Sequence, residues 1–260
     1  MAMNDLPFST ELNLPREPFS GHVRLLLVPL PEGEPPSVDL ALEYNGTRSV
    51  LALFGAAVNA QMFNRSDDVV SAWRADPPSI EARTFGIELQ ARVENLPLYA
   101  WAHLLALLRK NHDALEPLQS ASITAEGAHG ELPVGDVVNV VPQDLRADEP
   151  PFEWEAVGAE KSRNISLEML FRDPVEPGVH ERVEDDLSVW LQMIILGAFD
   201  LEFEEADDLD PLGTVKSTSP YRIECFVPYY TGDMSGFVAL ENWLRHMHRQ
   251  GQALEEAGLQ

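Results

Sequence analysis

Residues 223–248 read IECFVPYYTGDMSGFVALENWLRHMH, and residues 87–112 read IELQARVENLPLYAWAHLLALLRKNH. The two stretches align without a gap, so that Ile223 falls on Ile87, Glu224 on Glu88 and His248 on His112. Each begins with alternating apolar and polar residues, the period that predicts a strand with one buried face. Each then places apolar residues three and four positions apart, which predicts an amphipathic helix. The expected apolar faces are Leu98, Trp101, Leu105 and Leu108 in the first stretch and Phe237, Leu240, Leu244 and Met247 in the second. The chain is therefore expected to contain two related strand–helix units.

A second pair of matching segments lies upstream of the first. Alternating apolar residues run over 38–44 and again over 165–171, and each run leads into a very apolar stretch predicted as a helix. These helices are expected at about 49–63 and about 181–199, and each is followed by a loop with an Asp-Pro pair. A further strand is predicted at 22–29, in a hairpin with 37–44, and 152–157 is its expected counterpart in the second half.

Together these patterns predict an α+β fold with internal duplication. Each of the two related halves is expected to be a small antiparallel sheet with helices packed on one face. The predicted organisation is a flexible N-terminal tail over 1–18, a first repeat over 19–119, a linker over 120–151, a second repeat over 152–250 and a C-terminal tail over 251–260.

The composition restricts the partners and the compartment. The 260 residues include 43 acids against 18 lysines and arginines, for a formal net charge of -25. Such a chain repels nucleic acid and anionic membranes and suits a basic protein partner; alternatively, the charge only aids solubility. The longest nearly apolar run, 187–199, is shorter than the roughly 20 residues that span a bilayer. With one cysteine, Cys225, and no secretory signal pattern in 1–18, a cytoplasmic location is expected.

Motifs for catalysis, metal ions or cofactors are not evident, and we expect no catalytic residue, metal site or cofactor. Phosphate-binding glycine motifs and clustered Cys and His are missing from the sequence. Cys225 shares a predicted strand face with Ile223 and Val227, which favours a buried small hydrophobe over a nucleophile. His246 and His248 stand two apart on a predicted helix, point in different directions and are expected to be exposed.

Two carboxylates remain as candidates for acid–base chemistry. Glu88 and Glu224 occupy the same position in the two halves and are expected to point away from the core. If the halves face each other, the two side chains could approach and share a proton. The alternative is that each is an ordinary solvated strand residue.

The strongest charge feature is the segment Asp200–Asp210, in which seven of eleven residues are acidic and apolar residues are interleaved. It lacks the glycine and the spacing of an EF-hand calcium loop. It is either a solvated loop or an acidic docking surface, where carboxylates steer a basic partner and an aromatic residue supplies apolar contact. The predicted partner-binding residues are Asp200, Glu202, Phe203, Glu204, Glu205, Asp207, Asp208 and Asp210.

Three classes of function are compatible with these observations. The first is an acidic protein-binding module, one form of which is an immunity-type inhibitor that neutralises a toxin by occluding a basic surface or active site. The second is a structural or assembly subunit whose acidity is incidental, and a homo-oligomer suits it. The third is an enzyme with a site at the interface of the two halves. We expect the first.

Overall fold

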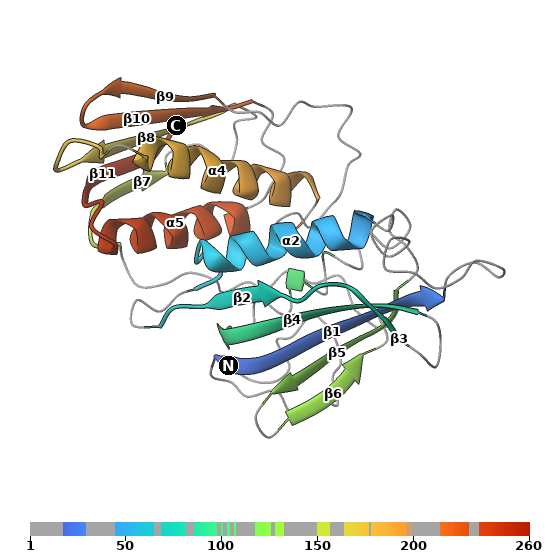
Figure 1. Ribbon diagram of the computed structural model, residues 1–260. Coiled ribbons are helices and arrows are strands. Elements are labelled where there is room, and N and C mark those ends of the chain that lie inside the picture. Colours follow the sequence, from blue (N-terminus) through green and yellow to red (C-terminus); the bar gives the residue numbers. More distant parts are fainter. Residues whose placement is uncertain are drawn as a thin grey trace. The chain divides into compact units, whose positions relative to one another are not determined.

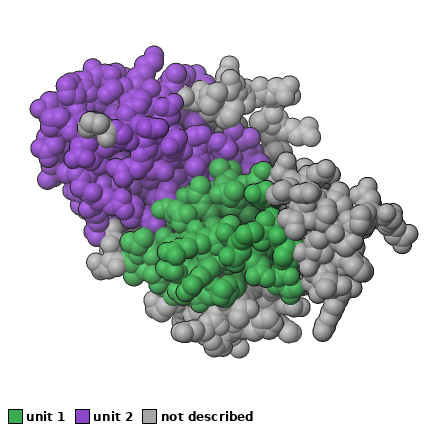
Figure 2. Space-filling view, viewed as in Figure 1, with its two compact units in different colours: residues 1–59, 69–142 green, residues 60–68, 143–260 purple. Residues whose placement is uncertain are grey.

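The computed structural model describes residues 18–29, 45–64, 69–81, 86–97, 100, 103–104, 107, 118–125, 128–132, 150–156, 164–176, 178–196, 198, 214–228 and 234–260. Within these residues the chain combines three helices with two sheets, which confirms the α+β class (Figure 1). The chain divides into two compact units (Figure 2). Unit 1 comprises residues 1–59 and 69–142, and unit 2 comprises residues 60–68 and 143–260.

The sheet of unit 1 is antiparallel in every described pairing. Its strand order is β2 (Ala72–Ala75), β4 (Gly86–Leu96), β1 (Phe19–Pro29), β5 (Leu118–Ala125) and β6 (Ala128–Leu132), with β3 (Ser79–Glu81) also paired to β4. The expected hairpin partner of β1, residues 37–44, lies outside the described residues. Strands β5 and β6 occupy part of the segment 120–151 predicted as a linker, and Gly130 lies within β6.

Helix α2 (Asn45–Asn59) packs against β2 through Trp73. The Phe54 ring meets the Trp73 ring edge-on, with centroids 5.3 Å apart. The Asn59 side chain accepts a hydrogen bond from the Trp73 N–H at 2.8 Å and donates one to the Trp73 carbonyl at 3.1 Å. A Cβ atom at Gly55 would lie 2.3 Å from Trp73 Cδ1, so only glycine permits this approach.

The helix predicted at 98–108 is described only in part. Ala100, His103, Leu104 and Leu107 are helical and buried, whereas the apolar face predicted there, Leu98, Trp101, Leu105 and Leu108, lies outside the described residues.

The sheet of unit 2 has the order β7 (Glu153–Ala156), β11 (Leu254–Leu259), β8 (Ile165–Phe171), β10 (Arg222–Val227) and β9 (Thr214–Ser219). Its pairings are antiparallel except that β11 runs parallel to β7, which corrects the prediction of a purely antiparallel sheet. The prediction of a C-terminal tail over 251–260 was also wrong. Leu254, Ala257 and Leu259 of β11 are fully buried, so this segment contributes to the core of the unit.

Helices α4 (Val179–Ile195) and α5 (Met234–Arg249) lie on the same side of this sheet (Figure 1). The strands turn alternate residues toward them, Ile165 to Phe171 on β8 and Ile223 to Val227 on β10. The Trp190 indole of α4 donates a 2.8 Å hydrogen bond to the Gly236 carbonyl of α5. The predicted apolar face of α5 is confirmed, because its four residues are buried: Phe237, Leu240, Leu244 and Met247.

Helix α5 is also buried on its polar side, which its amphipathic pattern does not predict. Asn242 donates a 3.1 Å hydrogen bond to the carbonyl of Met62, a residue of unit 2. Met62 and Phe63 are buried, and Gln61 takes a left-handed backbone conformation with φ 65°. Residues 61–64, which follow α2 along the chain, therefore pack onto α5. None of the described helices is long and apolar enough to cross a membrane.

Candidate functional site

All residues of the acidic segment Asp200–Asp210 lie outside the described residues, so the partner-binding site predicted there stays a prediction. A second group of carboxylates is described in unit 2, on the side of the sheet opposite α4 and α5. We call it the acidic face, and it consists of Glu155, Glu168, Glu224 and Glu256.

The pairing of the strands places these carboxylates in adjacent positions. Glu224 of β10 stands directly opposite Glu168 of β8. Glu168 is opposite Gly258 of β11, and Gly258 is in turn opposite Glu155 of β7. Side chains directly opposite in an antiparallel pair have Cβ atoms about 5 Å apart, and like charges there destabilise the sheet. The row thus concentrates negative charge across four neighbouring strands.

A hollow of about 390 Å³ opens on this face. Gly258 leaves the space between Glu168 and Glu155 free of a side chain, although a Cβ atom would fit there at 3.6 Å from its nearest neighbour. The residues that line the hollow include three of the four carboxylates together with Leu170 and Arg222.

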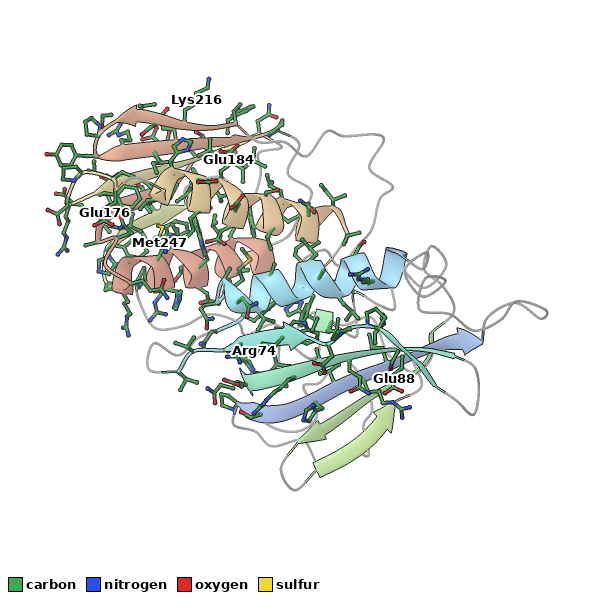
Figure 3. The ribbon with its side chains drawn as sticks, viewed as in Figure 1. Arg74, Glu88, Glu176, Glu184, Lys216 and Met247 are labelled. Atoms are coloured by element: carbon green, nitrogen blue, oxygen red, sulfur yellow. The ribbon has the colours of Figure 1, made fainter. Side chains whose placement is uncertain are left out.

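Two cations accompany the carboxylates of the acidic face. Arg222 Nη1 lies 3.6 Å from Glu168 Oε2, and both side chains are substantially exposed. Lys216 stands opposite Glu224 at the edge strand β9 and extends away from α4 (Figure 3). Glu224 also accepts a 3.1 Å hydrogen bond from the Thr218 hydroxyl. Exposed ion pairs of this kind contribute little, so the face stays open to a competing cation.

An aromatic ring flanks the carboxylates. Phe226 lies two residues beyond Glu224 on the same face of β10 and is 46% exposed. Tyr221, in the turn before β10, is 44% exposed. Few large apolar side chains are exposed among the described residues, and these two stand at either end of the same strand. Exposed aromatics beside a charged surface are typical of contact points for a protein partner.

The structure separates Glu88 from Glu224 by unit and gives each a different environment. Glu88 lies in unit 1 and is 8% exposed. The Arg24 guanidinium donates two hydrogen bonds to the Glu88 carboxylate, at 2.7 Å and 3.0 Å, and the Gln90 side-chain amide donates a third. A carboxylate held in this bidentate way is an ion-pair partner, and the described contacts do not favour a proton-sharing role for it.

Cys225 and the helix-end histidines have structural positions. Cys225 is fully buried beside Ile223 and Val227, as predicted, and burial raises the pKa of its thiol to about 12. His248, expected to be exposed, is half-buried: its Nδ1 accepts a 3.0 Å hydrogen bond from the Leu254 N–H at the start of β11. His246, also expected to be exposed, is half-buried too, and its Nε2 lies 2.7 Å from the Gln250 amide nitrogen.

Sequence reasoning identified Glu224 but missed its three neighbours on the acidic face. The signal for Glu168 was present, since it alternates with the apolar residues of 165–171 and must point outward. Glu256 joins it through the pairing of β11 with β8, and Glu155 joins it through the pairing of β7 with β11. The partners in each of these pairings are far apart in the sequence, so no local pattern reveals them.

Metal-ligating side chains do not converge in groups of three within the described part of the chain. Comparison of the chain with protein-family models, with curated protein sequences and with solved structures found no match.

Proposed function

We propose that this protein is an acidic protein-binding module whose partner presents a basic surface. The observation that carries the proposal is the direct opposition of Glu224 and Glu168 on the outer face of unit 2. Two carboxylates in this position repel each other and weaken the pairing of β8 with β10. A lysine or arginine from a partner would remove that repulsion and gain charge-assisted hydrogen bonds to both.

The shape and charge of the face suit a protruding cationic side chain. The hollow beside Gly258 gives such a side chain room between Glu168 and Glu155. The net charge of -25 would attract a basic partner over a distance and raise its association rate. Phe226 would supply the apolar contact that slows dissociation. Occlusion of a basic active site in this manner is the mechanism of an immunity-type inhibitor.

The segment Asp200–Asp210 is proposed as a second part of the same surface. It repeats the combination of carboxylates and an aromatic residue, with Phe203 in the position of the apolar anchor. The proposal places the protein in the cytoplasm, because a lone cysteine provides no disulfide to stabilise the fold elsewhere. Cell fractionation checks the location.

An arginine-rich peptide is the probe for a first test. The double variant Glu168→Gln and Glu224→Gln removes two charges from the acidic face and keeps the size of both side chains. The matched control is Glu184→Gln with Asp185→Asn, which removes two charges from the exposed side of α4 in the same unit (Figure 3). We expect the first variant to weaken binding by several-fold more than the control at low salt. A third variant, Gly258→Leu, fills the hollow without changing any charge and should also weaken binding.

Equal binding by all variants would show that the peptide senses only the total charge of the chain, and the acidic face would lose its assigned role. If binding weakens in the Glu168→Gln and Glu224→Gln variant but not in Gly258→Leu, the two carboxylates bind the peptide and the hollow does not contribute.

We also propose that the two units descend from one duplicated element. In unit 1 the chain runs through β1, α2, β2, β3, β4 and β5; in unit 2 it runs through β8, α4, β9, β10, α5 and β11. In both, the first of these strands pairs antiparallel with a later one in the centre of the sheet, β1 with β4 and β8 with β10. Leu25 faces Leu89 in one pairing, and Leu167 faces Cys225 in the other.

This register defines which residues of the two proposed repeats correspond, and it differs from the match suggested by the sequence pattern. Because Leu89 aligns with Cys225, Leu25 corresponds to Leu167 and Val23 to Ile165. The sequence pattern instead matched residues 38–44 with β8. An experimental structure tests the new alignment by superposition of β1 and β4 on β8 and β10. A superposition offset by one residue would place Leu25 and Leu167 on opposite faces and contradict it.

A further inference from the structure

A row of basic residues crosses the sheet of unit 1 on the face away from Trp73. Arg74 of β2 stands directly opposite Arg92 of β4, and Arg92 stands directly opposite His22 of β1. All three side chains are exposed. The register continues through Thr124 of β5 to His129 of β6. We call Arg74, Arg92 and His22 the basic row.

The basic row is unfavourable for the sheet when nothing is bound. Arginines directly opposite on adjacent strands repel each other, just as opposed carboxylates do. Elsewhere in this sheet an arginine is paired with a carboxylate: Arg24, two residues beyond His22 on β1, forms an ion pair with Glu88 at 2.7 Å. Arg74 and Arg92 have no such ion pair with any described residue. Figure 3 shows Arg74 on β2, apart from Glu88 on β4.

The composition of the chain makes this arrangement unexpected. Acids outnumber lysines and arginines by 43 to 18, so an arginine placed without constraint meets acidic neighbours. The nearest acidic residues along these strands are Glu94 and Asp76. Glu94 follows Arg92 by two residues on β4 and stands opposite Ala72, and Asp76 follows Arg74 by two residues and donates its backbone N–H to the Gln90 carbonyl. Solubility does not require positive charges side by side on an acidic protein.

We propose that Arg74 and Arg92 bind a phosphate group. Two arginines whose Cβ atoms are about 5 Å apart can each donate a pair of hydrogen bonds to different oxygens of one phosphate dianion. The bound dianion cancels the repulsion between the two arginines, so binding stabilises the sheet. His22 extends the site on the β1 side as a third donor. The phosphate is either the free ion or part of an ester, and both share this chemistry.

This site is separate from the proposed acidic face, which belongs to the other unit and attracts the opposite charge. The two proposals are therefore tested by different variants, and failure of one leaves the other unaffected.

Inorganic phosphate is the probe, titrated into the full chain against sodium chloride at matched ionic strength. Calorimetry gives the affinity, and amide chemical shifts of β2 and β4 give the location. The variant Arg74→Gln with Arg92→Gln removes both donors, and Arg48→Gln with Arg182→Gln removes two exposed arginines elsewhere. We expect saturable binding with shifts centred on residues 72–75 and 90–94, retained in the control and weakened by at least about tenfold in the variant.

The variant's fold is checked by its thermal midpoint without phosphate, which should equal or exceed that of the natural chain because the repulsion is gone. Phosphate should then raise the midpoint of the natural chain and leave the variant's unchanged. Phosphoserine distinguishes the sources: tighter binding than phosphate indicates an ester, and weaker binding indicates the free ion. Equal effects of phosphate on the natural chain and the variant, or acetate binding as tightly as phosphate, would overturn the proposal.

Discussion

The indole nitrogen of Trp243 on α5 donates a 2.7 Å hydrogen bond to the Asp186 carboxylate on α4. Burial raises the pKa of Asp186, and the hydrogen bond from Trp243 and the charge of Arg182 only partly oppose this effect. The ionised form is therefore less favourable in the folded chain than in the unfolded one. This contact joins the helices at a cost in stability that is small below the usual pKa of an aspartate and grows to its full size as the pH rises above the raised pKa of Asp186.

Replacement of Asp186 separates the hydrogen bond from the charge. Asp186→Asn keeps an oxygen acceptor for Trp243 and removes the ionisation, so its free energy of unfolding at neutral pH should equal or exceed that of the natural chain. Asp186→Ala leaves the indole N–H without its acceptor and should lose about 1–3 kcal/mol. Urea unfolding of both variants measures the difference. Equal losses in the two would show that neither the acceptor nor the charge explains the contact.

His248 should make the stability of unit 2 depend on pH. Burial, and next the positive charge of Arg172, lower the pKa of His248, and protonation of Nδ1 would also remove the acceptor for the Leu254 N–H. A base with a lowered folded pKa contributes stability above its unfolded pKa of about 6.5, and this stability is lost as the pH falls through that value. The urea midpoint should therefore drop between about pH 7.5 and 5.5 by more in the natural chain than in His248→Gln. Parallel pH profiles would contradict this.

The contact between α2 and Trp73 should tolerate no methyl group at Gly55. Alanine favours a helix over glycine by up to about 1 kcal/mol, but its Cβ atom would lie 2.3 Å from Trp73 Cδ1. We expect Gly55→Ala to destabilise unit 1 by about 1–3 kcal/mol, as overpacking does. In a Trp73→Leu background the same change should cost much less, since the ring that it strikes is gone. Gly258→Ala, with a nearest neighbour at 3.6 Å, serves as the control.

Cys225 should resist thiol reagents in the native protein. Its side chain has no exposed surface, and burial raises its pKa to about 12, so almost no thiolate is present at pH 8 or so. Labelling should be slow without denaturant and complete within the unfolding time when urea is added. Rapid labelling of the native chain would place the residue on the outer face of β10.

The sequence predicted the elements with regular patterns and missed those without them. The alternation of Ile223, Cys225 and Val227 identified both β10 and its buried face. Strand β11 has two adjacent glutamates after Leu254, and an irregularity between Leu254 and Glu256 shifts its register, so its buried residues break the period of two. Strand β9 is an edge strand with mostly exposed polar residues and carries no apolar signal at all.

The candidate sites were less accessible to sequence reasoning than the fold. The acidic face and the basic row are each assembled from strands that are distant along the chain, so no window of sequence contains them. Asp200–Asp210 stood out because its charges are consecutive. Local density of charge is visible in a sequence, whereas opposition of charges across a sheet depends on register.

The carboxylates and the aromatic residues of the proposed binding surface should differ in how they contribute to binding. Seven carboxylates within Asp200–Asp210 repel one another, and a basic partner would relieve this repulsion on approach. Replacement of Glu204, Glu205, Asp207 and Asp208 by Gln or Asn should slow association, because charges at the rim of an interface mainly steer the encounter. Phe203→Ala and Phe226→Ala should instead speed dissociation, since buried aromatic contacts determine how long a complex lasts.

Association kinetics at low and high salt, with the arginine-rich peptide and then with any basic protein partner, measure both effects. The quadruple variant should lose several-fold in association rate at low salt, and the difference should shrink as salt screens the charges. Its unfolding midpoint should change little. If the association rate of the quadruple variant equals that of the natural chain and neither depends on salt, the segment is a solvated loop, and a structural subunit becomes the better account of the protein.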